Sequence, residues 1–405
     1  MSITLLGNIL QIAVFAGLIL AGILIILIWV KDKTKNISTL RLFVQIAFTV
    51  LIFLGLIIGP YGLPQNPYIG DAPRDRLVGA DLFGNQFPDG LSVPVLACWY
   101  PNGRTITCAV WQLQAYLFPF WESGPGFGWG TFYSLNGLQR IAIVFGFLIA
   151  MSLVIGRAFC GWLCPFGLYN DLMIRIRKLF GKKHISFSDR TNKALGQSRY
   201  LIIAAFLILS VILGSQAIFG IQLIDNTAPG EYYYSYFSAP FCQVCPMKPL
   251  CVLIEIGVGA MLPLQEINHS TGAFYQAGYY VTSLNLAVLA IVTIGALAYR
   301  RFWCRICPLG GLTALFSTFY PFKKVALLRL NKIEEKCTKC GICKRVCPTQ
   351  VTEVYEEKGG DVTVSGCMLC ARCVEMCPYE DCLEVKMAGK PVLKSRNWLE
   401  PTENE

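Results

Sequence analysis

Histidine is almost absent from this 405-residue chain, which contains only His184 and His269. A b-type haem held by two histidines would need both of them, and the topology inferred below places them on opposite sides of a membrane. A bis-histidine cytochrome is therefore excluded within this chain. Charged residues are also scarce, at 15% of the sequence. No feature of the sequence indicates a nucleic-acid partner.

Apolar residues are abundant instead. They make up 54% of the chain, and its mean hydropathy is positive, which is too apolar for a soluble enzyme of this size. We expect an α-helical integral membrane protein with about five transmembrane helices. The predicted spans are residues 4–30, 42–59, 138–155, 199–220 and 277–298.

Basic residues orient these spans. They follow the first, third and fifth spans, as Lys31, Lys33, Lys35 and Arg41, then Arg175, Arg177, Lys178, Lys182 and Lys183, and then Arg300 and Arg301. The positive-inside rule places these ends in the cytoplasm, and the N-terminus outside, of a prokaryotic inner membrane. A signal peptide is the alternative for residues 4–30, although no basic segment precedes them. Residues 252–264 are too short to span and contain Glu255, so we expect a re-entrant or interfacial helix there.

The most informative stretch runs from Cys337 to Pro378. It contains the C-x2-C-x2-C-x3-C-P pattern twice, and it resembles a two-cluster bacterial ferredoxin, in which the fourth Cys of each run binds the other cluster. The resemblance implies one [4Fe-4S] cluster at the first ferredoxin site and another at the second ferredoxin site. The first site comprises Cys337, Cys340, Cys343 and Cys377, and the second comprises Cys367, Cys370, Cys373 and Cys347.

Structural zinc is the alternative at these sites, but zinc usually takes four Cys or His ligands in two pairs. Residues 351–364 alternate apolar and polar side chains around Gly359 and Gly360, so we predict a small hairpin that caps the clusters. The expected fold of this domain is α+β and ferredoxin-like. Cys382 lies beyond the last ligand and reads as a spare buried thiol.

A second motif occurs twice, at residues 157–168 and 301–312. Each copy has an Arg, an aromatic residue, a Cys, a Cys-Pro step and a Gly-Leu that opens a helix. Each follows a span that runs inward, so both copies end at the same face of the membrane. Their four cysteines could complete a further cluster, the inner site, which comprises Cys160, Cys164, Cys304 and Cys307. Buried thiols or a redox-active dithiol pair are the alternatives.

The paired motifs followed by a ferredoxin module resemble the NapH-type and NosR-type membrane polyferredoxins over residues 138–385. The resemblance implies electron transfer, often between the quinone pool and a partner reductase. Two features depart from the pattern: the second motif is C-x2-C-P where the family usually has C-x3-C-P, and the external flavin domain of the NosR type is absent. Arg157, Arg301 and Arg305 would offset the negative charge of a cluster, or serve as positive-inside anchors.

A third cysteine group is expected at the outer face. Cys242, Cys245 and Cys251 supply three thiolates, and Cys98 or Cys108 would supply the fourth. We name this group the outer site. The alternative is a disulfide between Cys98 and Cys108, with the other three as zinc ligands or packed thiols. His269 is a candidate proton acceptor near the outer face, or a solvent-facing side chain.

These features divide the chain into five predicted regions. They are two transmembrane helices (1–60), an external loop region (61–137), a membrane iron–sulfur core (138–320), a cytoplasmic ferredoxin domain (321–390) and a tail (391–405). Two to four [4Fe-4S] clusters would form a wire across a hydrocarbon layer about 30 Å thick. The expected partners are other subunits of a redox complex, a soluble ferredoxin or dehydrogenase, an external reductase or cytochrome, and quinone. The alternative function is a membrane assembly or redox-sensing factor that supports another metalloenzyme.

Overall fold

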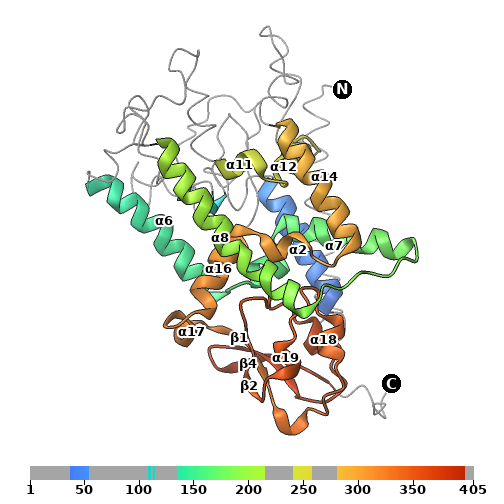
Figure 1. Cartoon of the computed structure of the whole chain (residues 1–405). Helices are drawn as coiled ribbons and strands as arrows, with labels where there is room; N and C mark the ends of the chain where they lie inside the picture. The colour runs from blue at the N-terminus through green and yellow to red at the C-terminus, as the bar shows by residue number, and fades with distance from the viewer. Residues whose placement is uncertain are drawn as a thin grey trace, which may run out of the picture. The chain divides into compact units, whose positions relative to one another are not determined.

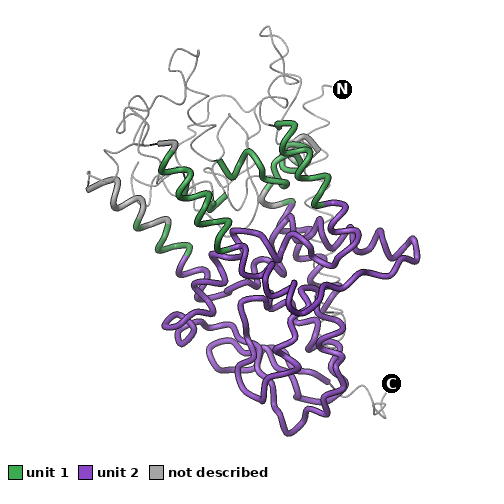
Figure 2. Tube along the Cα trace, viewed as in Figure 1, with its two compact units in different colours: residues 1–7, 50–148, 200–292 green, residues 8–49, 149–199, 293–405 purple. Residues whose placement is uncertain are grey.

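The computed structural model describes residues 37–53, 108–110, 113–114, 135–214, 240–257 and 281–396. The chain forms two compact units, each built from separate stretches of sequence (Figure 2). Unit 1 comprises residues 1–7, 50–148 and 200–292, and unit 2 comprises residues 8–49, 149–199 and 293–405. The paired motifs and the ferredoxin module lie in unit 2, whereas the outer site lies in unit 1.

Four apolar helices occupy the described parts of the predicted spans (Figure 1). They are α2 (Ile37–Phe53), α6 (Leu135–Val154), α8 (Asp189–Gly214) and α14 (Ser283–Ala298). Among the described residues, the α8 segment Asp189–Ile212 is long and apolar enough to cross a membrane, and shorter apolar segments lie in the other three helices. The predicted span at residues 4–30 lies outside the described residues.

The predicted interfacial segment at residues 252–264 is helical as far as the structure describes it. Helix α11 (Pro240–Val244) leads into α12 (Lys248–Gly257), which begins before the predicted start. Residues 258–264 lie outside the described part of the chain.

The two Cys-Pro motifs fold in the same way. A short helical segment, the π-helical turn η2 (Phe159–Leu163) or α15 (Trp303–Ile306), ends at an extended Cys. A Pro then begins a helix, α7 (Pro165–Leu179) or α16 (Pro308–Thr318). Proline disfavours the helical conformation in the residue before it and suits the first helical position. The predicted opening of a helix after each motif is therefore confirmed.

The ferredoxin module follows α17 (Phe322–Val325) and contains a four-stranded antiparallel sheet. The strands are β1 (Leu328–Lys332), β2 (Gly360–Asp361), β3 (Leu383–Met387) and β4 (Lys390–Lys394), in the order β2-β1-β3-β4. Leu330 pairs with Val385 at the centre of the β1–β3 ladder. The cysteine runs carry η4 (Glu334–Lys336), α18 (Ile342–Val346), α19 (Glu353–Glu356) and α20 (Arg372–Glu375). The α+β prediction holds for this part.

The predicted hairpin at residues 351–364 is wrong. Helix α19 occupies its first half, and β2 pairs with β1 rather than with a neighbouring strand. Val351 and Val354 are three residues apart, which is a helical spacing, and both enter the core with Val362. Burial of these three side chains against Leu330 therefore outweighs the local alternation.

We expect Leu330→Ala to destabilise the ferredoxin module by about 2–5 kcal/mol, because it leaves a cavity beneath the sheet. Leu330 is 1% exposed. Loss of the visible iron–sulfur absorbance on heating measures the effect. Val392→Ala on exposed β4 is the matched control, and equal melting of the two variants would contradict this view of the core.

Candidate iron–sulfur sites

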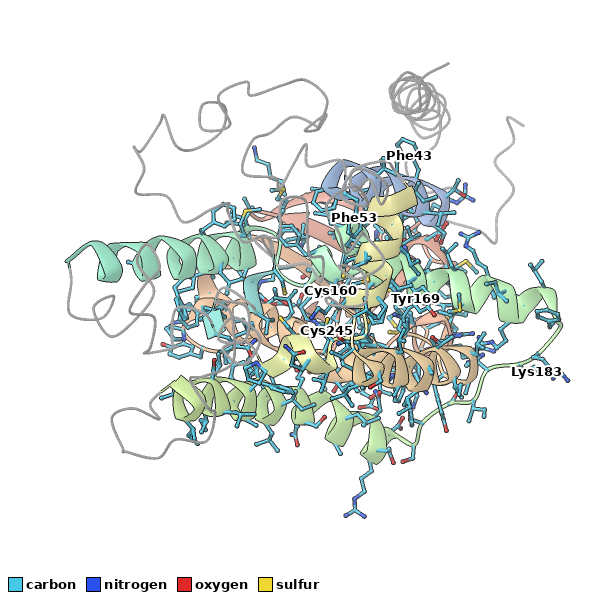
Figure 3. The ribbon with its side chains drawn as sticks, turned by 90° about the horizontal axis from the view of Figure 1, so that it is seen from above. Phe43, Phe53, Cys160, Tyr169, Lys183 and Cys245 are labelled. Carbon is cyan, nitrogen blue, oxygen red and sulfur yellow. The ribbon has the colours of Figure 1, made fainter. Side chains whose placement is uncertain are left out.

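The two Cys-Pro motifs hold each other through a reciprocal exchange of hydrogen bonds. Arg157 of the first motif donates from Nη2 to the carbonyl of Cys304, at 2.9 Å. Arg301 of the second motif donates from Nη1 to the carbonyl of Cys160, also at 2.9 Å. Both arginines are almost completely buried, and Cys160 is labelled in Figure 3. The equivalent Arg of each motif therefore fixes the first Cys of the other.

The similarity between the two motifs extends to a glycine in each. A Cβ on Gly167 would lie 2.8 Å from Nη1 of Arg301, and a Cβ on Gly310 would lie 3.1 Å from Nη2 of Arg157. Each guanidinium group thus lies against the helix that begins at the Cys-Pro step of the other motif. Glycine is required at Gly167 because any side chain there would displace the arginine.

Asp171 pairs with Arg301 of the second motif, a role that its place in α7 did not predict. Its carboxylate accepts from Nε of Arg301 at 2.8 Å, from Nη2 of Arg301, and from Arg41 at 3.3 Å. Burial alone raises the pKa of a carboxyl group, but the charges of Arg301 and Arg41 outweigh it and lower the pKa of Asp171. This acid is therefore ionised within a buried charge network.

The reciprocal contacts bring the four predicted inner-site cysteines together. Cys307 is close enough to Cys160, Cys164 and Cys304 for their charges to interact. Nη1 of Arg301 also lies 3.8 Å from Sγ of Cys304. Four thiols beside cationic guanidinium groups fit the negative charge of a thiolate-bound cluster.

Among the described residues, no three His, Cys, Asp or Glu side chains are close enough to share one metal ion. A [4Fe-4S] cluster differs from a single ion, because each of its four thiolates binds a separate iron. Whether the sites fit such a cluster is therefore judged from the residues, N–H groups and charges around the thiols.

The second ferredoxin site surrounds an internal cavity. All four predicted ligands line it, together with apolar side chains such as Leu330 and Val354. Backbone N–H groups point at the thiols: Val351 donates to Sγ of Cys347 at 3.3 Å, and Leu369 donates to Sγ of Cys367 at 3.5 Å. Such hydrogen bonds stabilise bound thiolates and tune the cluster. These residues fit the predicted cluster.

Burial disfavours the thiolate form of Cys367 and Cys373. It raises the pKa of Cys367 to about 12 and that of Cys373 well above its ordinary value. Iron would have to displace the protons, since only thiolates bind it. Assembly of this site therefore releases protons.

The first ferredoxin site lies closer to solvent, because Cys340 is exposed. Cys382 is buried, as predicted, but it is not merely a spare thiol. It lies beside Cys377 and Cys337, and its hydrogen bond with Cys377 lowers the pKa of that ligand. The spacing of Cys382 in the sequence did not predict its position beside the first ferredoxin site.

The first Cys-Pro motif contacts the second ferredoxin site directly. Nε1 of Trp162 donates to the carbonyl of Leu369 at 2.9 Å. A Cβ on Gly161 would lie 2.6 Å from the carbonyl oxygen of Met368 and 3.4 Å from Cβ of Cys370. The motif that holds Cys160 and Cys164 is therefore packed against the loop that holds Cys367 and Cys370.

The second motif reaches the same site from another side. Arg305 donates to the carbonyl of Thr349 at 2.7 Å and to Oε1 of Gln350 at 2.9 Å, just after Cys347. Its guanidinium also lies over the ring of Phe187, 5.1 Å from the centroid, which is a favourable cation–π contact. Both motifs thus meet the second ferredoxin site.

Unit 1 gathers the described cysteines of the outer site. Cys108 lies close enough to Cys242 and Cys245 for their charges to interact. Asn285 donates from Nδ2 to the carbonyls of both, at 3.0 and 3.1 Å. Cys251, six residues after Cys245, is buried on α12. Cys98 and His269 lie outside the described residues.

We expect Asp171→Asn to weaken the inner site selectively. It leaves the guanidinium groups of Arg301 and Arg41 without their carboxylate partner, a change that costs roughly 3–5 kcal/mol in a buried pair. Iron per chain, measured after anaerobic purification, should fall by about the four atoms of one cluster. Asp189→Asn, on an exposed carboxylate, should not change it. Full iron content in Asp171→Asn would contradict the assigned role.

Two family profiles match the regions just described. A profile described as "4Fe-4S binding domain" matches residues 138–183 and 282–325, which contain the two Cys-Pro motifs. A profile described as "4Fe-4S dicluster domain" matches residues 329–378. The chain therefore contains several [4Fe-4S]-binding regions. No solved structure matches the chain.

Three curated relatives illustrate the match. The chain is 24% identical to YccM of Escherichia coli over 62% of this chain and 58% of YccM. It is 28% identical to the uncharacterized protein MJ0750 of Methanocaldococcus jannaschii over 60% of this chain and 77% of that protein. It is 23% identical to the ferredoxin-type protein NapH of Escherichia coli over 55% of this chain and 59% of NapH. Together with the two profiles, these matches show that the chain is similar to ferredoxin-type proteins such as NapH and carries the same kind of [4Fe-4S]-binding regions.

Proposed function

We propose that the protein is a membrane-bound electron-transfer subunit. It would conduct electrons between a cytoplasmic redox partner, the quinone pool and an external partner. The contact of both Cys-Pro motifs with the second ferredoxin site carries this proposal. The apolar helices and the basic residues at their ends support the membrane location.

The contacts also suggest the order of the stations. Gly161 and Trp162 link the inner site to the loop of Leu369 and Cys370. Electrons would therefore pass between the inner site and the second ferredoxin site. The first ferredoxin site, with exposed Cys340, would exchange them with a soluble partner.

The outer site would continue the path on the other side. Cys108 is one candidate for its fourth ligand, because it lies near Cys242 and Cys245, and Cys98 is the other. The assembly or sensing function remains the second candidate. The number of clusters per chain distinguishes it from electron conduction.

The first test counts iron, acid-labile sulfide and reduced-state spins in anaerobically purified protein. Four loaded sites give about 16 iron atoms per chain, at four per cluster. The Cys304→Ala variant should lose about four of them, whereas Val392→Ala should lose none. About eight iron atoms in the unaltered chain would instead favour the assembly or sensing function.

A second prediction concerns coupling between sites. Gly161→Ala places a methyl group 2.6 Å from the carbonyl of Met368, so the loop must move away. We expect slower electron exchange between the inner and second ferredoxin sites, followed by rapid-freeze EPR, with iron content retained. Gly196→Ala is the control, since a Cβ there meets nothing within 4 Å. Unchanged exchange in Gly161→Ala would contradict the proposed order.

A further inference from the structure

A group of cationic side chains surrounds Lys178 of α7 in unit 2. Arg300 and Arg372 interact with Lys178 of α7, and so do Arg175 and Arg177 of the same helix. His184, in the loop after α7, interacts with Arg300, Arg177 and Lys178. We call these six residues the basic cluster.

In the part of the chain that the structure describes, the basic cluster has no carboxylate partner, although Arg300 interacts with the Cys347 thiolate. No ion pair to any of its members is found there, and residues 172–188 contain no Asp or Glu. Burial, followed by repulsion from neighbouring arginines, lowers the pKa of Lys178. Like charges held together at a protein surface call for a counter-charge from outside the chain.

An exposed apolar stripe runs along α7 beside the basic cluster. Leu172, Ile176, Leu179 and Phe180 follow helical spacing, and Leu179 and Phe180 are 86% and 74% exposed. The opposite face of the helix is buried through Asn170, Ile174 and Arg177. A helix with an apolar stripe flanked by Lys and Arg is typical of a membrane-interface helix.

The position of this surface is fixed by backbone contacts. Ile185 forms a parallel bridge with Tyr299, and its N–H donates to the carbonyl of Ala298 at 3.0 Å. Arg177 donates to the carbonyls of Leu297 and Ala298, at the last turn of α14. The basic cluster therefore lies at the end of an apolar helix, and exposed Lys183 lies on the loop after α7 (Figure 3).

We propose that the basic cluster and the apolar stripe of α7 form a binding site for an anionic phospholipid. The phosphate of the headgroup would lie among Arg175, Lys178, Arg300 and Arg372, and the acyl chains would contact Leu179 and Phe180. The proposal rests on the membrane location given under Proposed function. It adds a specific lipid requirement at the face where the ferredoxin module begins.

The apolar stripe favours a lipid over an acidic redox protein. A partner that is recognised by charge alone would not need two large apolar side chains as exposed as Leu179 and Phe180. An anionic lipid would match both the apolar stripe and the basic cluster, because its acyl chains cover the stripe and its phosphate neutralises the cations.

The test uses the whole chain, reconstituted in vesicles with equal amounts of phosphatidylcholine and phosphatidylglycerol. After mild detergent extraction, the retained lipids are counted per chain by mass spectrometry. The unaltered protein should retain phosphatidylglycerol selectively. The triple variant Arg175→Gln, Lys178→Gln, Arg300→Gln should lose this selectivity, with affinity falling about fivefold for each charge removed. The control triple variant Lys339→Gln, Lys358→Gln, Lys390→Gln removes exposed charges elsewhere and should retain the lipid.

A second variant reports on the apolar half. In Phe180→Trp, brominated phosphatidylglycerol should quench the new fluorescence more strongly than brominated phosphatidylcholine does. Equal retention of both lipids by the unaltered protein would overturn the proposal. Release of the bound lipid by inorganic phosphate alone would also overturn the proposal. So would a triple variant that retains the lipid but loses electron exchange with a soluble acidic ferredoxin. A chain that purifies without detergent would instead refute the membrane location.

Discussion

The reciprocal hydrogen bonds between Arg157 and the carbonyl of Cys304, and between Arg301 and the carbonyl of Cys160, are the constraint on which the sites of unit 2 depend. A buried guanidinium group must find several acceptors, and here the acceptors are the backbone of the opposite motif. The exchange fixes two turns that are far apart in sequence. Asp171 then forms an ion pair with Arg301, whereas Arg157 is held by backbone carbonyls.

The same constraint extends into the ferredoxin module. Arg157 also donates to the carbonyl of Ser365, just before Cys367. Trp162 and Arg305 reach the loops on either side of the second ferredoxin site. One arginine therefore links both motifs to the segment that supplies a ferredoxin ligand. Buried Arg157 and Arg305 therefore act as internal links between the motifs and the ferredoxin module.

The hydrogen bonds around the sulfur atoms give each site a distinct environment. The second ferredoxin site is buried and receives N–H groups from Val351 and Leu369. The first has an exposed ligand, Cys340, and a neighbouring thiol, Cys382. The inner site faces the guanidinium of Arg301. Because solvent, hydrogen bonds and nearby charge set the potential of a cluster, these differences would separate the potentials of the stations along a path.

Sequence alone determined the chemistry of this protein, because ligand spacing in the two Cys runs and the two Cys-Pro motifs is local. It also determined where α7 and α16 begin, since Pro165 and Pro308 act on their immediate neighbours. Tertiary structure decided which partners meet across the chain. Asp171, Gly161 and the setting of Cys382 gave no local signal, and the helical spacing of Val351 and Val354 prevailed over a hairpin because burial against Leu330 depends on residues distant in sequence.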